Sequence, residues 1–374
     1  MKKFAFLLVA TAALALAGRA QPIDPHATAE TRALFTNLGV VAREHILVGH
    51  HHTTARGAGW RWQGDRSDVR TLVGDFPAVH GWDFSLLVAE PDRRADARRD
   101  IVAAFERGAV ITLSWHATNP VSGGNYQEHT PAVAAILPGG SHHAKFVAML
   151  DDLAGFLATL SDQSGRAVPV IFRPWHEHTG ATMWWGQPYC TTEEFVALWR
   201  FTVQHLRDRH GLHHLLWAYS PNRRASPEKY FERYPGDAWV DVLGYDFYSK
   251  TDLARAVPCL RLAVAEAAKR GKLAAFTETG PQAGWRQNGK PDYFTGELLP
   301  LLRDDPALRG LAYVLFWQNS SEEQHWIPLP DEFGAEDFKK FHADPFTFFE
   351  RDLPPLYTLP ADNATRAVAP KPPS

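Results

Sequence analysis

Short apolar segments alternate with longer amphipathic segments along most of the chain, and this alternation restricts its possible folds more than any other feature. Each apolar segment is followed by polar or aromatic residues and then usually by a helical pattern. The eight strand candidates are His45–His50, Pro77–Phe84, Ala109–Trp115, Val168–Trp175, Leu212–Tyr219, Val240–Phe247, Leu273–Thr277 and Leu311–Trp317. Near-continuous apolar strands separated by helices are typical of parallel strands covered on their faces. Eight such units predict a (β/α)8 barrel.

The clearest helical patterns span Lys145–Thr159, Thr192–Arg209 and Leu253–Arg270, where Leu, Phe and Ala recur at helical spacing. A doubly wound sheet is the alternative architecture, but no GxGxxG motif follows the first strand. The chain has 374 residues, and α/β barrels of this size form one domain. We therefore expect a single barrel domain over residues 21–353.

The N-terminal segment has the three-part layout of a secretory signal peptide. Lys2 and Lys3 are basic, Phe4–Ala17 is an apolar run too short to anchor as a span, and small residues lead to Ala20. We expect residues 1–20 to be removed and the mature protein to be secreted or periplasmic; a retained anchor is the alternative. No later stretch reaches about 18 consecutive apolar residues, so we expect no membrane span.

Residues 354–374 are rich in Pro and Ala and predict a mobile tail.

Cysteine content and net charge exclude two other classes of protein. Cys190 and Cys259 are the two cysteines of the chain, and neither lies in a spacing that binds metal. A disulfide scaffold is therefore excluded, and we do not expect the two to pair. The net charge of -3 predicts no nucleic-acid surface, and we expect a monomer.

Chemistry-bearing residues follow the predicted strands. In a barrel the reacting groups come from the C-terminal strand ends. In strand order these ends carry His50–His52, Trp82–Asp83, Trp115–His116 with Asn119, Trp175–Glu177, Ser220 with Asn222, Tyr245–Tyr248, Glu278 and Trp317–Asn319. Among them, Glu177 follows the fourth strand and Glu278 the seventh, on opposite sides of the barrel.

Two opposed carboxyl groups at a barrel mouth fit glycoside hydrolysis. One must be protonated to donate to the leaving oxygen, while the other stays ionised to attack the anomeric carbon. A carboxyl separation near 5–5.5 Å indicates retention of configuration, and about 6.5–9.5 Å indicates inversion. Both steps use carboxylates and water, so no cofactor is expected. Arg173 precedes this site, and its charge would favour an ionised Glu278; a purely structural ion pair is the alternative.

Several stretches together resemble glycoside hydrolase family 26, the β-mannanase family. The family's acid/base segment is matched in this chain by Phe172–Gly180 followed by Trp184–Gly186. Its nucleophile segment is matched by Phe276–Gly280. Further matching stretches are Val48–His51, Leu113–His116 with Asn119–Pro120, Trp217–Asn222 and Gly244–Tyr248. The resemblance covers His45 to Trp317, and each motif falls on its predicted strand end.

The resemblance implies roles for individual residues. Glu177 would be the general acid/base and Glu278 the nucleophile, with Tyr248 hydrogen-bonded to the nucleophile. Trp317 would form a stacking floor for a sugar ring, because apolar sugar faces stack on aromatic rings. The remaining residues expected to contact substrate are His51, His116, His176, Trp185 and Tyr248.

The sequence also departs from the family pattern. Thr182–Met183 stand where many of these mannanases have Trp-Phe, and His178 replaces an expected Asn or Met. The expected activity is cleavage of β-1,4-mannosidic bonds by double displacement. The family also contains β-1,3-xylanases and mixed-linkage glucanases, so these substrates stay open.

Two other function classes share some of these sequence features. His50 and His52 form the H-x-H motif of metal-dependent amidohydrolase barrels, but the later strand ends lack the rest of that ligand set. A carbohydrate-binding barrel without catalysis would also have a tryptophan-rich rim. Glu177 and Glu278 together favour catalysis over binding alone, and no metal site is expected.

Overall fold

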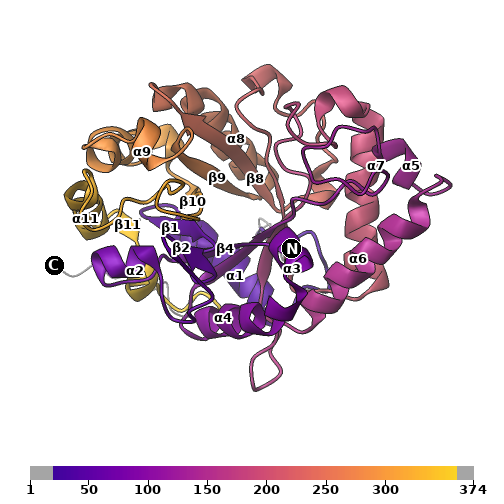
Figure 1. Cartoon of the computed structure of the whole chain (residues 1–374), viewed down its shortest axis with the longest axis horizontal. Coiled ribbons are helices and arrows are strands. Elements are labelled where there is room, and N and C mark those ends of the chain that lie inside the picture. The colour runs from indigo at the N-terminus through magenta and orange to yellow at the C-terminus, as the bar shows by residue number, and fades with distance from the viewer. Residues whose placement is uncertain (1–19, 360–374) are drawn as a thin grey trace, which may run out of the picture.

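The computed structural model describes residues 20–359, which form a closed parallel barrel surrounded by helices (Figure 1). The barrel strands are β1 (Ile46–His51), β4 (Val79–Asp83), β5 (Val110–Ser114), β6 (Val170–Arg173), β7 (Leu215–Tyr219), β8 (Val242–Ser249), β9 (Leu273–Pro281) and β10 (Leu311–Phe316). Each pairs in parallel with the next, and β10 pairs with β1 to close the ring, with Leu47 opposite Tyr313. The predicted (β/α)8 barrel is therefore confirmed.

Helices surround the strands. They are α1 (Ala29–Val41), α2 (Asp68–Val73), α3 (Phe84–Ala89), α4 (Arg94–Glu106), α5 (Val133–Ile136), α6 (His143–Ala158), α7 (Thr192–Val203), α8 (Val257–Arg270), α9 (Trp285–Asn288), α10 (Leu299–Asp304) and α11 (Ala335–Ala343). The Thr191 side chain caps α7 together with Glu194 in a capping box, which satisfies backbone N–H groups that the first helical turn leaves unpaired. None of the described helices is long and apolar enough to cross a membrane.

The core has two layers, because alternate strand residues point to opposite faces. Ile46 and Val48 of β1 pack in the layer between strands and outer helices. Leu47, between them, packs in a second cluster with residues of the other strands and with Leu34 and Leu38 of α1. The inner layer therefore fills the barrel, and α1 covers its N-terminal end.

Three short strands lie outside the eightfold pattern. β2 (Arg56–Gly57) and β3 (Trp60–Arg61) form an antiparallel hairpin after β1. β11 (Thr347–Phe348) pairs with the start of β1 on the edge opposite β10, the edge that β4 occupies further along β1. The helix expected over residues 192–209 changes into a π-helical turn at Gln204–Arg209. Periodicity does not reveal such short or irregular elements.

The C-terminal segment differs from expectation where it is described. Leu356 is 1% exposed, the Tyr357 hydroxyl donates to the Ala109 carbonyl at 2.6 Å, and Asn37 Nδ2 donates to the Leu356 carbonyl at 2.9 Å. Residues 354–359 are therefore packed rather than part of a mobile tail, because an apolar side chain there reaches the core. Residues 360–374 of that tail, and residues 1–19 of the expected signal peptide, lie outside the described residues.

Candidate active site

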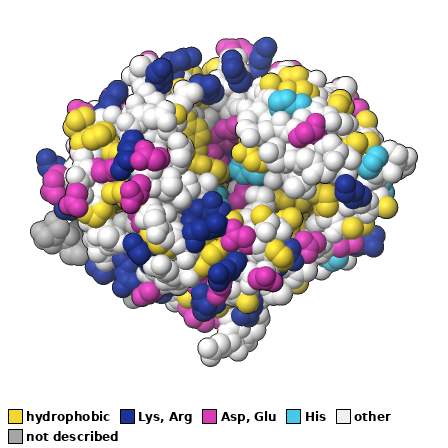
Figure 2. Space-filling model, in the orientation of Figure 1, with side chains coloured by type: hydrophobic (Ala, Val, Ile, Leu, Met, Phe, Trp, Pro, Cys, Tyr) yellow, Lys and Arg dark blue, Asp and Glu magenta, His cyan; other side chains and the backbone are white. Residues whose placement is uncertain are grey.

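A cleft of about 890 Å³ opens at the C-terminal ends of the barrel strands, and acidic side chains lie inside the hollow that Figure 2 shows. Among the sequence-predicted residues, its lining includes His116, Glu177, Tyr248, Glu278 and Trp317. The loop after β5 contributes Tyr126 and Gln127. The cleft thus collects side chains from strands that are far apart in the sequence.

Glu177 follows β6 in an unusual backbone conformation. Its φ is 53°, in the left-handed region that non-glycine residues seldom occupy, and its backbone N–H donates to the Ser220 carbonyl at 2.9 Å. The Asn222 amide donates to Glu177 Oε2 at 3.2 Å, and Thr179 in turn holds Asn222. Such local strain persists where surrounding contacts impose it, and it is often found at functional sites.

Burial raises the pKa of Glu177, and the nearby negative charge of Glu278 raises it further. The Asn222 hydrogen bond acts in the opposite direction because it stabilises the ionised form. The net result is a carboxyl group that keeps its proton to higher pH than an ordinary glutamate.

Glu278 lies near the end of β9 and is 4% exposed. Its Oε1 pairs with the Arg173 guanidinium, and its Oε2 accepts a hydrogen bond from the Tyr248 hydroxyl at 2.8 Å. The two oxygens therefore face donors from two different strands, and Glu278 is held as an acceptor.

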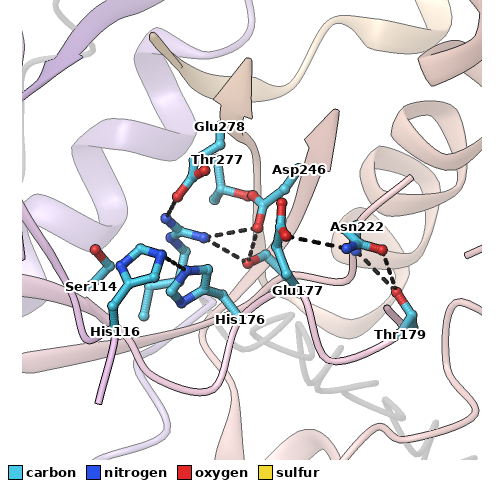
Figure 3. Close-up of polar contacts among 12 residues, drawn as sticks. Ser114, His116, His176, Glu177, Thr179, Asn222, Asp246, Thr277 and Glu278 are labelled. Atoms are coloured by element: carbon cyan, nitrogen blue, oxygen red, sulfur yellow. Dashed lines mark hydrogen bonds and ion pairs between the residues drawn. The ribbon is translucent and has the colours of Figure 1, made fainter. Parts of the chain in front are cut away.

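Arg173 connects the two sides of the site by pairing with both Asp246 and Glu278, and Figure 3 shows these two carboxylates on neighbouring strands. Its side chain, which is 1% exposed, donates through Nη1 to Asp246 at 2.8 Å. Burial alone would lower the pKa of Arg173, but the charges of Asp246 and Glu278 raise it. Asp246 also accepts from Ser220 at 3.0 Å and Thr277 at 2.6 Å. Asp246 is thus a hydrogen-bonded partner that orients its neighbours.

A second polar chain begins at Asp83. Its Oδ2 lies 2.5 Å from His116 Nδ1, and His116 Nε2 lies 3.1 Å from His176 Nε2. Burial alone would lower the pKa of His116, but the Asp83 carboxylate raises it overall. Burial and the positive charge of Arg173 lower the pKa of His176. A protonated His116 would therefore donate to both neighbours, with His176 neutral.

Trp317 forms an aromatic wall of the cleft. His51 stacks on its far side, with ring centroids 4.4 Å apart and planes inclined by 11°, and His116 meets it edge-on at 5.7 Å. His51 is 1% exposed and lies outside the cleft lining. In this structure His51 lies behind Trp317 and supports its ring, and the substrate contact expected of His51 stays a prediction.

Two further expected contact residues are also buried behind the surface. Trp185 is 0% exposed, its indole N–H donates to the His176 carbonyl at 2.8 Å, and it packs against Trp175 and Trp184. His176 is 0% exposed and is covered by His116. Both rings fill the space beneath the loop that carries Glu177, and the substrate contacts expected of Trp185 and His176 stay predictions.

Sequence reasoning missed Trp326, which lines the cleft from the loop after β10. Its ring meets that of Tyr248 edge-on at 6.4 Å. Gly280 makes this approach possible, since its φ is 143° and an added Cβ would lie 2.4 Å from the Trp326 ring. The sequence feature that could have pointed to Trp326 is its position as a tryptophan in a polar loop after the last strand.

The H-x-H residues do not form a cluster of potential metal ligands. Within residues 20–359, the group of three potential ligand atoms close enough for one ion is Asp151, His205 and His210. This group joins α6 to the π-helical turn after α7, and both histidines lie within hydrogen-bond distance of Asp151 Oδ1. It is separate from the cleft lining.

Comparison with known proteins identifies the family. A sequence model described as Glycosyl hydrolase family 26 matches residues 23–284. A mannan endo-1,4-β-mannosidase of Bifidobacterium adolescentis is 33% identical over 347 residues, covering 85% of this chain and 34% of that protein. The chain thus spans about a third of that relative's length. A Bacillus subtilis protein of the same name is 29% identical over 76% of this chain and 80% of its own length.

Solved structures agree. A modular endo-β-1,4-mannanase of Cellulomonas fimi superposes with a TM-score of 0.87 at 38% identity, covering 92% of this chain and 80% of that one. A family 26 β-mannanase of Bacteroides ovatus gives 0.83 at 37% identity, covering 91% and 100%. Since the family model spans more than half of the sequence and these structures match nearly the whole barrel, the chain belongs to glycosyl hydrolase family 26.

Proposed function

We propose that this chain is a retaining endo-β-1,4-mannanase that cleaves mannan-type polysaccharides. The observation that supports it most is the pair of carboxyl groups in one cleft with opposite environments. Burial and the neighbouring negative charge of Glu278 raise the pKa of Glu177, whereas donors face both oxygens of Glu278. Environments that separate two carboxyl groups in this way assign the acid and the nucleophile. The names of the similar proteins support mannan as the substrate.

In the first step, Glu278 attacks the anomeric carbon while Glu177 gives its proton to the departing glycosidic oxygen. The C–O bond to the leaving sugar breaks as the bond to Glu278 forms. In the second step, the ionised Glu177 takes a proton from water, and that water displaces Glu278 from the anomeric carbon. Glu177 regains its proton and the product keeps its configuration.

Neighbouring side chains support these steps. Arg173 and Tyr248 hold the Glu278 oxygens in place, and Trp317 offers an aromatic face to a sugar ring. His116 lies beside Trp317 in the cleft lining, so it would border the same sugar ring. No cofactor enters either step.

Product analysis tests the proposal. Purified protein would be incubated with linear mannan, galactomannan, β-1,3-xylan and mixed-linkage glucan, and early products would be resolved by NMR. We expect manno-oligosaccharides with a β-configured new reducing end. Glu278→Ala should give none, whereas Glu44→Ala, an exposed glutamate after α1, should match the wild type. Products from xylan or glucan alone would reject mannan, and an α-configured product would reject retention.

We also propose that residues 1–20 direct export of the chain to the periplasm or the medium. The basic start, the short apolar run and the small residues before Gln21 support this proposal. N-terminal sequencing of protein from culture fractions of the producing cells tests it. A mature start at Gln21 is the expected result, and an uncleaved chain confined to the cytosol would overturn it.

A further inference from the structure

A second pocket, of about 190 Å³, adjoins the cleft. The residues that line both are Arg223, Arg224, Tyr248 and Gln282, so the two spaces share a wall. Its other walls come from the segment after β8 and include Lys250, Asp252 and Arg255. Tyr248, whose hydroxyl holds the proposed nucleophile, separates this side pocket from the reacting centre.

The side pocket is strongly cationic. Arg223, Arg224, Lys250 and Arg255 are all exposed there, and within the described chain none of these four side chains forms a salt bridge. Arg223 donates instead to the neutral Gln282 amide at 3.1 Å. The one acidic residue lining the pocket, Asp252, uses its Oδ1 to cap a short helical turn. Figure 2 shows Lys and Arg side chains gathered along the upper rim of the hollow.

This arrangement contrasts with that of several other exposed arginines of the protein. Arg61, Arg166 and Arg286 each pair with a carboxylate. The whole chain carries a net charge of -3, so four unpaired cations at one pocket are a local departure from its average. A neutral mannan chain presents no group that would use them.

We propose that the side pocket binds a carboxylate carried by a sugar substituent of the glycan in the cleft, so that the substrates include uronate-bearing mannans. Arginine matches a planar carboxylate with two parallel hydrogen bonds. Because Arg223 and Arg224 follow Asn222 directly, a bound carboxylate lies beside the residue that contacts Glu177. The proposal rests on the proposed mannanase function and narrows its substrate class.

A matched pair of substrates tests the pocket. One galactomannan is used untreated and after mild oxidation of a fraction of its primary hydroxyls to carboxylates. The ratio of kcat/KM for the oxidised to the neutral polymer is then measured at about 20 mM and about 300 mM NaCl, which bracket a Debye length of about 10 Å. The wild type should show a ratio above one that falls towards one at high salt.

Two variants locate the effect. The double variant Lys250→Gln/Arg255→Gln removes two cations. Both side chains line the side pocket, and neither lines the cleft. At low salt the double variant should lower the ratio about three- to tenfold, as expected for two partly solvated charges, and leave turnover of neutral mannan unchanged. Arg43→Gln, at an exposed arginine after α1, should change neither value.

The outcomes separate the two proposals. An unchanged ratio in the double variant overturns the anionic pocket, whereas absent turnover of neutral mannan by the wild type counts against the mannanase function. Binding of both polymers to Glu278→Ala, measured by affinity electrophoresis, does not depend on turnover. Equal retardation by the two polymers would also reject the pocket.

Discussion

At the scale of single residues, the site depends on how each carboxyl group is surrounded. Glu177 and Glu278 carry the same side chain, yet Glu177 has one amide donor, whereas Glu278 has a cation and a phenol. Sequence motifs predicted both glutamates as well as Tyr248 and Trp317, because these residues directly follow or end strands. They did not predict that His51 and Trp185 face inward, because only the folded loops decide which aromatic ring reaches the cleft.

The pKa of Glu177 sets one limb of the pH profile. Its raised pKa keeps the proton needed for the first step, so activity should fall when pH rises through that value. Asn222→Ala removes the hydrogen bond that stabilises the ionised form of Glu177. This change should raise the pKa of Glu177 further and move the alkaline limb of the profile to higher pH. A profile of kcat/KM against pH checks this, and a limb that moves to lower pH would contradict it.

Tyr248→Phe removes one hydrogen bond to Glu278 without changing the ring. Hydrogen bonds to charged groups contribute about 1.5–3 kcal/mol, so we expect kcat to fall about 10- to 100-fold. Tyr234→Phe is the control, because its hydroxyl contacts the exposed Asp237 instead. Equal rates for wild type and Tyr248→Phe would remove Tyr248 from the mechanism.

At the scale of elements, the apolar runs predicted every barrel strand to within a few residues. The seventh strand is longer than predicted, because pairing with β8 continues past Glu278 to Pro281. That pairing shifts register, with Tyr245 opposite Phe276 and Asp246 opposite Glu278. A one-residue irregularity redirects side chains, and it is invisible in the apolar pattern.

Gly244 of β8 lies where the two strands and Ser220 come closest. An added Cβ would lie 2.6 Å from the Thr277 side chain and 3.1 Å from Ser220 Cβ, and both neighbours donate to Asp246. Gly244→Ala should therefore destabilise the protein by about 1–3 kcal/mol and reduce kcat. Urea unfolding and steady-state rates measure the two effects.

Gly155 of α6 provides the matched control, since an added Cβ would meet no atom within 4 Å. Alanine is preferred over glycine inside a helix by about 0.5–1 kcal/mol. Gly155→Ala should thus be neutral or stabilising and fully active. Similar losses in both variants would show that the contacts around Gly244 are not the cause.

At the scale of the whole molecule, the packed domain extends beyond its predicted end at residue 353. The Pro- and Ala-rich composition correctly indicates little regular structure there, but it does not reveal that one leucine reaches the core. Leu356→Ala should lower the free energy of unfolding by about 2–4 kcal/mol. Leu359→Ala, at a position 45% exposed, should leave it unchanged. An unchanged free energy of unfolding in Leu356→Ala would mean that this packed leucine does not contribute to stability.

The pairing of β1 with β10 also has a consequence for biosynthesis. Ribosomes add about 5–20 residues per second, so one edge of β1 waits on the order of tens of seconds before Tyr313 and its neighbours exist. During that time an apolar strand with open hydrogen-bonding groups is exposed, and such edges attract other chains. The half-made chain is therefore the form most prone to aggregation, and slower, cooler expression with ample chaperone should raise the yield of active protein.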